Sequence, residues 1–468
     1  MLRRPRITSR LSPALALALV GVLATGSLAA PIGAPQVPDP YFPADGNVGY
    51  DVRHYDIRDR YRFSDGRLSG TTTVRLVPTQ ELAEFNLDLL LTPDDVEIDG
   101  VDVDFEKADK HELVITPAAP LAAGEPVEVR VRYHGFPGRI AWDGEQNWLA
   151  NGSEVITMNE PHMAAWWFPS NDHPTDKARF DIRITVPKSK EVVSNGVLVG
   201  RVAREKTATT HWRMTDPMTT YLAFFAAGDF AIERGRAHGQ RYYNAVSERL
   251  GDRTQRSSMA TLRKSARITA WLEDELGDYP FATTGGVVTS LDPGFALENQ
   301  SRPTYWADPP LTIVVHELAH QWFGDSVSVA RWRDIWLNEG FATYLQLRYD
   351  EAHGGRSTDR SLHAYYRWYR GDDEFWDLTL TDPGPGRIFD FAVYDRGAMT
   401  LAALRNRIGK PDFRRLLRRW VAQHADGNVM AEQFEELAET VSGEELGPFF
   451  QAWLRDHRPP PNRPRFGL

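Results

Sequence analysis

The chain has 468 residues, of which 42% are hydrophobic and 25% are charged. This composition is typical of soluble globular proteins, and the length suits roughly two to four domains. The net charge is −10, from 54 basic and 64 acidic residues, so we expect no nucleic-acid partner. The absence of cysteine excludes disulfides, thiolate metal sites, iron–sulfur clusters and a cysteine nucleophile.

The N-terminus has the three parts of a secretory signal peptide. Four arginines and no acidic residue stand within residues 1–10, an apolar stretch covers 14–24, and mostly small residues occupy 25–30. The apolar stretch is shorter than the roughly 20 residues of a membrane span. We therefore predict cleavage after Ala29 and a secreted, extracellular protein with no stable membrane insertion after cleavage. An uncleaved anchor helix is the alternative, and both Sec and twin-arginine export stay open.

Residues 50–232 alternate between apolar and polar side chains. The alternation is clear at 54–58, 71–76, 127–131 and 180–186, and Gly, Pro and Asp separate these segments. Period-two runs that are bounded by turn residues predict short, half-buried strands. Many such strands without a long helical pattern favour an antiparallel β-saddle or β-sandwich domain.

After about residue 233 the apolar spacing changes to the period of a helix. The chain is therefore predicted to be an α+β protein, with an N-terminal β domain at 50–232 and a mainly helical domain at 233–457. A short segment, 30–49, precedes the β domain, and a Pro-rich tail, 458–468, follows the helical domain and should be extended. The predicted helices are 252–276, 311–328, 337–353, 396–408, 412–424 and 431–441.

The strongest chemical signal is an H-E-x-x-H motif, His316-Glu317-Leu318-Ala319-His320. Positions four apart lie on the same face of a helix, so both imidazoles can reach one zinc ion. Glu317 lies beside them and can reach a water at the metal without binding the metal itself. The alternative interpretation is an exposed helix with two solvated histidines.

A third ligand candidate, Glu339, follows His320 after an interval of 18 residues. It opens the next predicted helix, so the intervening hairpin can bring its carboxylate back to the metal. Two histidines and one glutamate with an open fourth position are typical of a catalytic zinc site, and we predict one Zn²⁺ per chain. On its own, Glu339 could also be a charge that the helix dipole favours, and cobalt or manganese suit the same donors.

Around this motif the sequence resembles the M1 family of zinc aminopeptidases, of the aminopeptidase N type. The resemblance rests on 316–324 (HELAHQWFG) and 334–342 (DIWLNEGFA), and it extends to 168–178 (FPSNDHPTDKA) in the β domain. It covers most of the chain after the predicted signal peptide. It implies a thermolysin-like (gluzincin) catalytic domain that follows the N-terminal β domain.

The resemblance implies further site residues. Residues 295–299 (FALEN) are similar to the family's G-x-M-E-N motif, so Glu298 would bind the free α-amine of the substrate and Ala296 would line the substrate. Tyr394, in a YDRG sequence similar to the family's Y-x-K-G element, would donate its phenol proton to the oxyanion. Glu160 lies near a family position that lines the pocket for the first side chain, where a glutamate would favour basic or small side chains. Without the resemblance, structural roles are the alternative for these residues.

Members of this family generally continue into a small β domain and a large helical domain that caps the active site. This sequence ends in the Pro-rich tail soon after Leu454. We therefore expect a short form without the capping domain and with a more open cleft.

These features together predict a secreted zinc aminopeptidase that acts on peptides with a free N-terminus. Glu317 serves as general base and then general acid, and Tyr394 stabilises the oxyanion. One alternative keeps the zinc chemistry in an endopeptidase or another hydrolase. The other is a catalytically impaired, M1-like peptide-binding protein. The sequence indicates neither the preferred N-terminal residue nor the oligomeric state.

Overall fold

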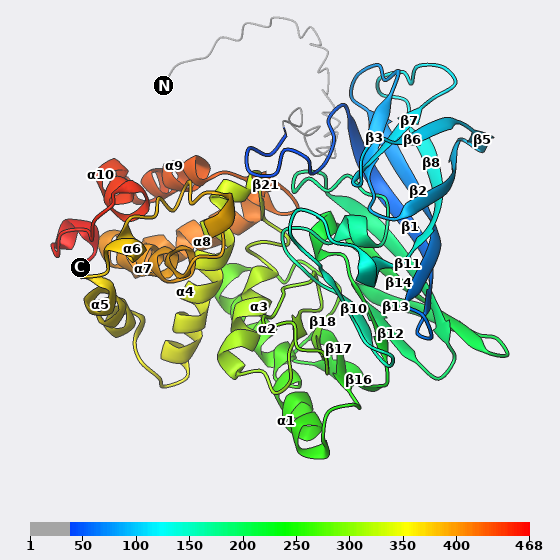
Figure 1. Ribbon diagram of the computed structural model, residues 1–468. Coiled ribbons are helices and arrows are strands. Elements are labelled where there is room, and N and C mark those ends of the chain that lie inside the picture. Colours follow the sequence, from blue (N-terminus) through cyan, green and yellow to red (C-terminus); the bar gives the residue numbers. More distant parts are fainter. Residues whose placement is uncertain (1–37) are drawn as a thin grey trace, which may run out of the picture. The chain divides into compact units, whose positions relative to one another are not determined.

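An eight-stranded sheet dominates the first half of residues 38–468, the part of the chain that the computed structural model describes. The predicted signal peptide, 1–29, lies outside the described residues. Figure 1 shows the sheet in blue to green. In spatial order its strands are β13 (Val197–Ala203), β14 (Thr207–Met218), β11 (Ala178–Pro187), β1 (Tyr50–Arg62), β2 (Arg67–Pro78), β8 (Val127–Gly135), β4 (Thr92–Ile98) and β5 (Val101–Asp102).

Burial along these strands follows the period-two pattern of the sequence. In β1 the register shifts between Val52 and His54, which marks a bulge. The bulge moves the following side chains to the other face of the strand, so Val52 and Tyr55 both lie in the core although they are three positions apart. The four predicted strand segments are confirmed as parts of β1, β2, β8 and β11. One pair departs from the predicted antiparallel arrangement, since β1 and β11 run parallel. A parallel pair needs a long crossover, and residues 63–177 supply it.

Two smaller sheets share one hydrophobic core with the large sheet. Their strands are short, and the loops between them carry part of the candidate site. One sheet contains β3 (Phe85–Asp88), β6 (Asp104–Lys107) and β7 (Glu112–Thr116), and the other contains β9 (Trp148–Ala150), β10 (Val155–Thr157), β12 (Glu191–Ser194) and β15 (Phe225–Gly228).

A fourth sheet joins the β region to the helical region. Its strands are β16 (Phe230–Ala237), β17 (Gln240–Ser247), β18 (Thr284–Val288) and β19 (Thr304–Tyr305). The predicted domain boundary at residue 232 falls inside β16, because this strand pairs along its whole length with β17, from Phe230–Ser247 to Ala237–Gln240. A change of hydrophobic period along the sequence does not show which strands pair, so it cannot locate a domain boundary relative to a hairpin.

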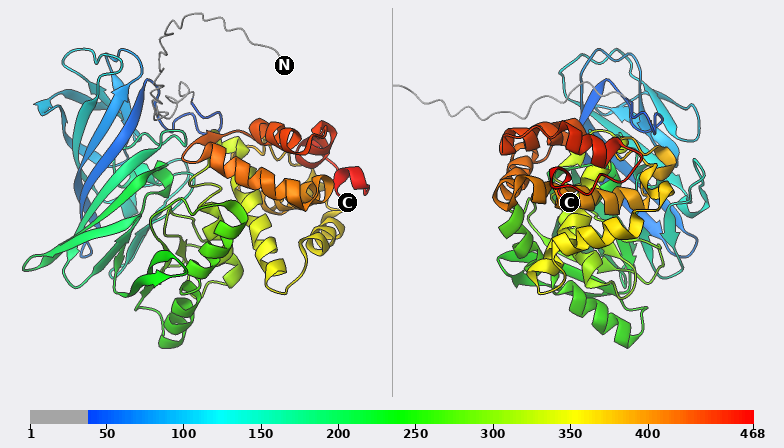
Figure 2. Two further views of the ribbon diagram at one scale, coloured as in Figure 1. Left: turned by 180° about the vertical axis from the view of Figure 1, so that it is seen from behind. Right: turned by 90° about the vertical axis from the view of Figure 1, so that its left-hand side faces the viewer.

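The second half is mainly helical, as predicted, so the α+β class is confirmed. Figures 1 and 2 show α4 to α10, in yellow to red, on the side that faces away from β1, β2 and β8. No helix of residues 38–468 is long and apolar enough to cross a membrane. The α-helices are α1 (Asp252–Leu262), α2 (Ser265–Leu276), α3 (Leu311–His320), α4 (Trp336–Ala352), α5 (Thr358–Tyr369), α6 (Asp373–Trp376), α7 (Phe391–Ile408), α8 (Lys410–His424), α9 (Ala431–Ser442) and α10 (Gly447–Phe450).

Several helix boundaries differ from the prediction. The predicted helix at 252–276 is two helices, α1 and α2. Helix α3 ends at His320, eight residues earlier than predicted, because the chain turns at Gly324, whose φ is 131°. Helix α7 begins five residues earlier, since the side chain of Asp390 accepts a hydrogen bond from Ala392 N and caps the helix. Helices α5, α6 and α10 were not predicted.

Both ends of the described chain pack against other elements. Residues 38–49, here called the N-terminal strap, contact the helical region, where Asp39 Oδ2 accepts a hydrogen bond from Trp332 N at 2.9 Å. In the Pro-rich tail the Pro460 and Phe466 carbonyls accept hydrogen bonds from Tyr366 and Trp453. The tail therefore lies along the helices.

Candidate active site

The three predicted metal ligands lie together. Helix α3 presents His316 and His320 one turn apart, and the first turn of α4 presents Glu339. Glu339 Oε2 is 3.1 Å from His316 Nε2 and 3.4 Å from His320 Nε2. One ligand atom from each residue lies within 4.8 Å of the others, so the three side chains could hold one metal ion.

The ring orientation of His320 and the charge of Glu339 suit a metal. His320 Nδ1 is 3.0 Å from the Phe323 carbonyl, and a proton on Nδ1 that donates to this carbonyl leaves Nε2 free as a donor to a metal. Burial would raise the pKa of Glu339, but the imidazoles of His320 and His316 lower it to about 2. Two imidazoles and one ionised carboxylate are the donors of a catalytic zinc site.

Two glycines bring Glu339 and Tyr394 close together. Helix α4 crosses α7 at Gly340 and Gly397, and a Cβ atom on Gly397 would lie 2.7 Å from Gly340 Cα. The helices therefore cross with backbone against backbone. Each glycine lies within one turn of a predicted site residue, so this crossing sets the distance between the metal ligand and the phenol.

Tyr394 lies beside the candidate metal ligands. Its ring is 6.0 Å from the ring of His316, centroid to centroid, and the two planes differ by 21°. Burial raises the pKa of Tyr394 well above its ordinary value, and the carboxylates of Glu339 and Glu160 raise it further. The phenol thus stays protonated and can donate a hydrogen bond.

Glu317 and Glu298 lie on the same side of the cluster. Oxygen atoms of both carboxylates lie within 4.8 Å of each other and of a nitrogen of His320. Burial raises the pKa of Glu317 well above its ordinary value; His320 opposes this rise, and Glu298 and Glu339 add to it. A carboxylate with a raised pKa is a stronger proton acceptor, which suits a general base.

Glu298 is held by contacts from both halves of the chain. The hydroxyl of Tyr221, from the β region, donates to Glu298 Oε1 at 3.2 Å. The Gln321 side chain, just after α3, donates to the Glu298 carbonyl at 2.8 Å. The sequence prediction did not include either residue, although Tyr221 is part of the TYL segment, 220–222, near the end of the predicted β domain.

Glu160 also faces the cluster, from the loop after β10. Its Oε1 atom is buried and has no hydrogen-bond partner among residues 38–468. Burial raises the pKa of Glu160 well above its ordinary value, and Glu298 and Glu339 raise it further. Ala296 is half-buried at the start of the Glu298 loop, and its contact with a substrate stays a prediction.

The cluster has more acids than bases. Glu339 raises the pKa of Glu160, Glu298 and Glu317, and His316 and His320 are the bases that face these carboxylates in the described part of the chain. Unpaired buried carboxylates are costly. The donor set and this excess of negative charge fit a divalent cation together with a ligand that carries an ammonium group.

A pocket of about 310 Å³ opens beside Glu160. The strap, the β region and the loop before α7 all contribute to its wall. The lining residues are Phe42, Glu145, Glu160, Pro161, Pro385, Gly386, Arg387, Ile388, Phe389 and Asp390.

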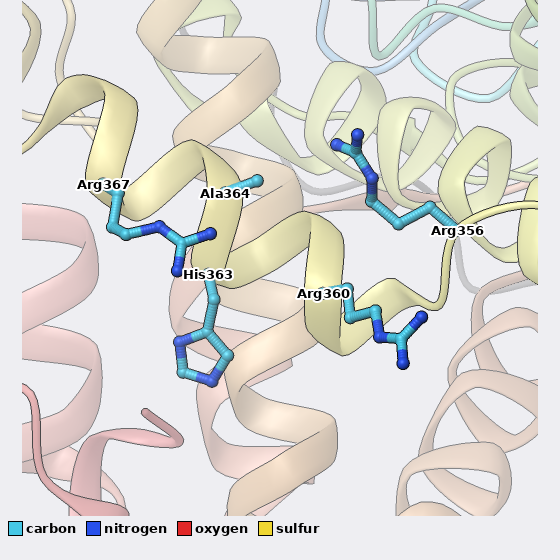
Figure 3. A pocket seen from close by; sticks show the side chains of 5 residues that line it. All are labelled: Arg356, Arg360, His363, Ala364 and Arg367. Atoms are coloured by element: carbon cyan, nitrogen blue, oxygen red, sulfur yellow. The ribbon is translucent and has the colours of Figure 1, made fainter.

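Another pocket, of about 410 Å³, lies on α5 and does not suit an ammonium ligand. Figure 3 shows its lining, which comes from α5 and the loop before it and contains three arginines, one histidine and one alanine. It has no carboxylate, and no predicted site residue lines it. The lining residues are Arg356, Arg360, His363, Ala364 and Arg367.

Two family models match the chain, one in each half. The model of the peptidase family M1 domain matches residues 286–453, and that of the peptidase M1 N-terminal domain matches 52–222. The chain belongs to the M1 peptidase family. Glu160 and Tyr221 fall within the N-terminal match, and the other site residues described above fall within the peptidase match.

Known M1 proteins are similar over most of this chain. Aminopeptidase N of Lactobacillus helveticus is 23% identical over 438 residues, which are 87% of this chain and 51% of that protein. A probable M1 family aminopeptidase 2 of Encephalitozoon cuniculi is 26% identical over 86% of this chain and 50% of its own length. This chain therefore spans about half the length of these relatives.

Solved M1 structures match the fold. An M1 zinc metallopeptidase from Deinococcus radiodurans is 28% identical, with a TM-score of 0.83, and the match covers 91% of this chain and 99% of that one. A variant of the same protein bound to a Tyr-Ser-Ala substrate matches with the same TM-score over 92% of this chain and 100% of its own. This likeness confirms the predicted order of a β domain followed by a helical catalytic domain.

Proposed function

We propose that this M1 family member is a zinc-dependent aminopeptidase that removes N-terminal residues from peptides with a free N-terminus. His316, His320 and Glu339 would hold one Zn²⁺ per chain. The observation that carries the proposal is the pairing of this donor set with the buried carboxylates of Glu298 and Glu160, which face the same space. The names of the M1 relatives, aminopeptidases and zinc metallopeptidases, support it.

The metal site, Glu317 and Tyr394 each have a separate chemical role in the proposed reaction. Zinc at this site would polarise the scissile carbonyl and lower the pKa of a water. Glu317 takes one proton from the attacking water and delivers it to the leaving amine as the carbon–nitrogen bond breaks. The hydroxyl of Tyr394 donates a hydrogen bond to the carbonyl oxygen as negative charge develops on it.

Glu298 and Glu160 make the enzyme an exopeptidase. A free α-ammonium group satisfies both carboxylates by charge-assisted hydrogen bonds. An internal peptide segment, as an endopeptidase would bind it, leaves the Glu160 Oε1 atom buried and unpaired, which is unfavourable. These carboxylates therefore favour an aminopeptidase over an endopeptidase.

The test compares unblocked and blocked substrates. We expect the purified protein to release p-nitroaniline from Ala-, Leu- and Arg-p-nitroanilides, to lose this activity with a chelator, and to reject the N-acetylated forms. Cleavage of the acetylated forms at a similar rate would contradict the exopeptidase assignment. Stoichiometric zinc without turnover of any substrate would support an impaired peptide-binding protein.

We also propose that the protein is secreted after cleavage of residues 1–29. The basic, apolar and small-residue segments of the sequence support this proposal. N-terminal sequencing of the protein from the culture medium tests it, and a start at Ala30 is expected. Intact residues 1–29 on a membrane fraction would favour the anchor helix.

A further inference from the structure

We propose that the pocket beside Glu160 binds a cationic side chain, arginine or lysine, on the N-terminal residue of the substrate. This proposal rests on the proposed function, because Glu160, one of the carboxylates assigned to the α-amine, lines the pocket. This preference would be set by Phe42, which lies in the strap, and by Glu145, which lies in the β region. Neither was predicted as a site residue.

Glu145 offers a free carboxylate oxygen at the pocket. Its Oε2 atom accepts a hydrogen bond from Asn147 Nδ2 at 2.7 Å and lies 3.1 Å from His162 Nδ1. Its Oε1 atom has no hydrogen-bond partner among residues 38–468, and the side chain is 34% exposed. Burial would raise the pKa of Glu145, but His162 and Asn147 lower it. The carboxylate is therefore ionised and can accept further donors.

Glu160 lines the same pocket nearer the metal ligands. Its buried Oε1 atom also has no partner in the described part of the chain. One pocket thus holds two carboxylates with uncommitted oxygens. An N-terminal arginine or lysine carries two cationic groups, its α-ammonium and its side-chain head, and can satisfy both carboxylates at once.

The basic residue in the lining does not cancel this charge. Arg387 donates from Nε and Nη2 to Asp390 Oδ2 at 3.0 and 2.7 Å. Asp390 in turn caps α7, so both groups are engaged with each other and with the helix. The open charge in the pocket is therefore negative.

The remaining wall suits the stem of a long side chain. Phe42 and Phe389 both line the pocket, and Phe389 is 39% exposed. Aromatic faces pack against methylene stems and attract a cation above the ring. Phe42 is held in place edge-on to the rings of His162 and Trp332, at 4.8 and 6.4 Å between centroids.

The test compares substrates of equal shape and different charge. The zinc-loaded enzyme is assayed with N-terminal arginine, citrulline and leucine p-nitroanilides, since citrulline has the shape of arginine without its charge. We expect kcat/KM for arginine to exceed that for citrulline by about twofold to fivefold, because a partly exposed charge pair has this order of effect. Glu145→Gln should bring the ratio close to one, and Phe42→Ala should lower the arginine/leucine ratio.

A matched control variant and the substrate ratios distinguish a failure of this proposal from a failure of the proposed function. Glu125→Gln removes an exposed glutamate of the same region that does not line the pocket, and it should leave the arginine/citrulline ratio unchanged. The proposal would be overturned by an arginine/citrulline ratio near one in the wild type. It would also be overturned if Glu145→Gln kept the wild-type ratio. In both cases turnover of the leucine substrate would still support the aminopeptidase. No turnover of any substrate would instead contradict the proposed function.

Discussion

Two clusters of buried charge in this molecule differ in their balance. In the β region, His162 lies between Asp45 and Glu145, at 2.7 and 3.1 Å. Nearby, His111 Nδ1 is 3.3 Å from Glu112 Oε1 and 3.6 Å from Asp88 Oδ1. Each histidine faces carboxylates that hold it protonated, and each carboxylate has a base beside it.

Asp88 is also satisfied by the backbone. It accepts hydrogen bonds from Gly46 N at 3.0 Å and from Asp172 N at 2.6 Å. The ring of His111 stacks on Trp142, at 4.1 Å between centroids. Asp88, His111 and Glu112 are close enough to be counted as possible metal ligands, but their bonds already hold the strap to the β region.

The cluster at the metal ligands lacks this balance. Among the described residues, Glu339 is the one carboxylate of this cluster that pairs with histidines, at 3.1 and 3.4 Å. Glu298 and Glu339 raise the pKa of both Glu160 and Glu317.

The difference teaches that buried carboxylates without a base beside them mark a ligand site, whereas carboxylates paired with histidines hold the strap and the β region together. Glu145 does both, because its Oε2 atom pairs with His162 and its Oε1 atom has no partner in the described part of the chain. Four predictions test this contrast, from the largest expected effect to the smallest.

Glu317→Gln should lower kcat by about 10²–10⁴-fold, because the amide cannot transfer the proton. Bound zinc should be unchanged, since Glu317 is not one of the three ligands. The measurement is turnover of an unblocked p-nitroanilide together with metal content. Glu112→Gln is the matched change in the balanced cluster and should keep the turnover. Equal losses in the two variants would contradict the contrast.

Zinc should stabilise the protein through the cluster at the metal ligands. Binding at 100 times Kd adds about 2.7 kcal/mol to the free energy of unfolding, so Tm should rise by several degrees when zinc is added to the chelated protein. His320→Ala should abolish this rise, and His111→Ala should keep it because Asp88 and its neighbours already have partners. A rise that persists in His320→Ala would place the metal elsewhere.

Gly397→Ala should lower kcat by about 10–100-fold, since the new methyl group would meet the backbone of Gly340 and push α7 away from α4. Tyr394 moves with α7, whereas the three ligands on α3 and α4 stay together. Turnover should thus fall while zinc content is kept. Gly447→Ala, a glycine with open space around it, is the control. Unchanged turnover in Gly397→Ala would show that the crossing does not position Tyr394.

The cluster around His111 and His162 should make the free energy of unfolding depend on pH. Burial would lower the pKa of His162, but Asp45 and Glu145 raise it to about 10, from an ordinary value of 6.5. The stabilisation is therefore complete below about pH 6.5 and is lost as the pH rises towards 10. The free energy of unfolding should fall by up to about 1.4 kcal/mol per pH unit in this window. Urea titrations of the wild type and His162→Gln check this, and parallel curves would contradict it.

The candidate metal site could be predicted because its pattern is local. The i, i+4 spacing of His316 and His320 follows from helix geometry alone, and Glu339 lies in the first turn of the next helix. The large strands were predicted for a similar reason, since a half-buried strand shows its period in consecutive residues. The proposed roles of Glu298 and Tyr394 needed the family resemblance, because a single buried Glu or Tyr has no local signature.

The sequence by itself determined the order of a β region and a helical region and indicated which three side chains could hold a metal. Only the tertiary structure decided what surrounds them. Phe42, Glu145 and Phe389 meet in one pocket although long stretches of chain separate them, and α4 crosses α7 at two glycines. Such neighbours result from packing between distant segments, and packing depends on the shape of the whole core, whereas helix and strand periods depend on the few residues next to each other.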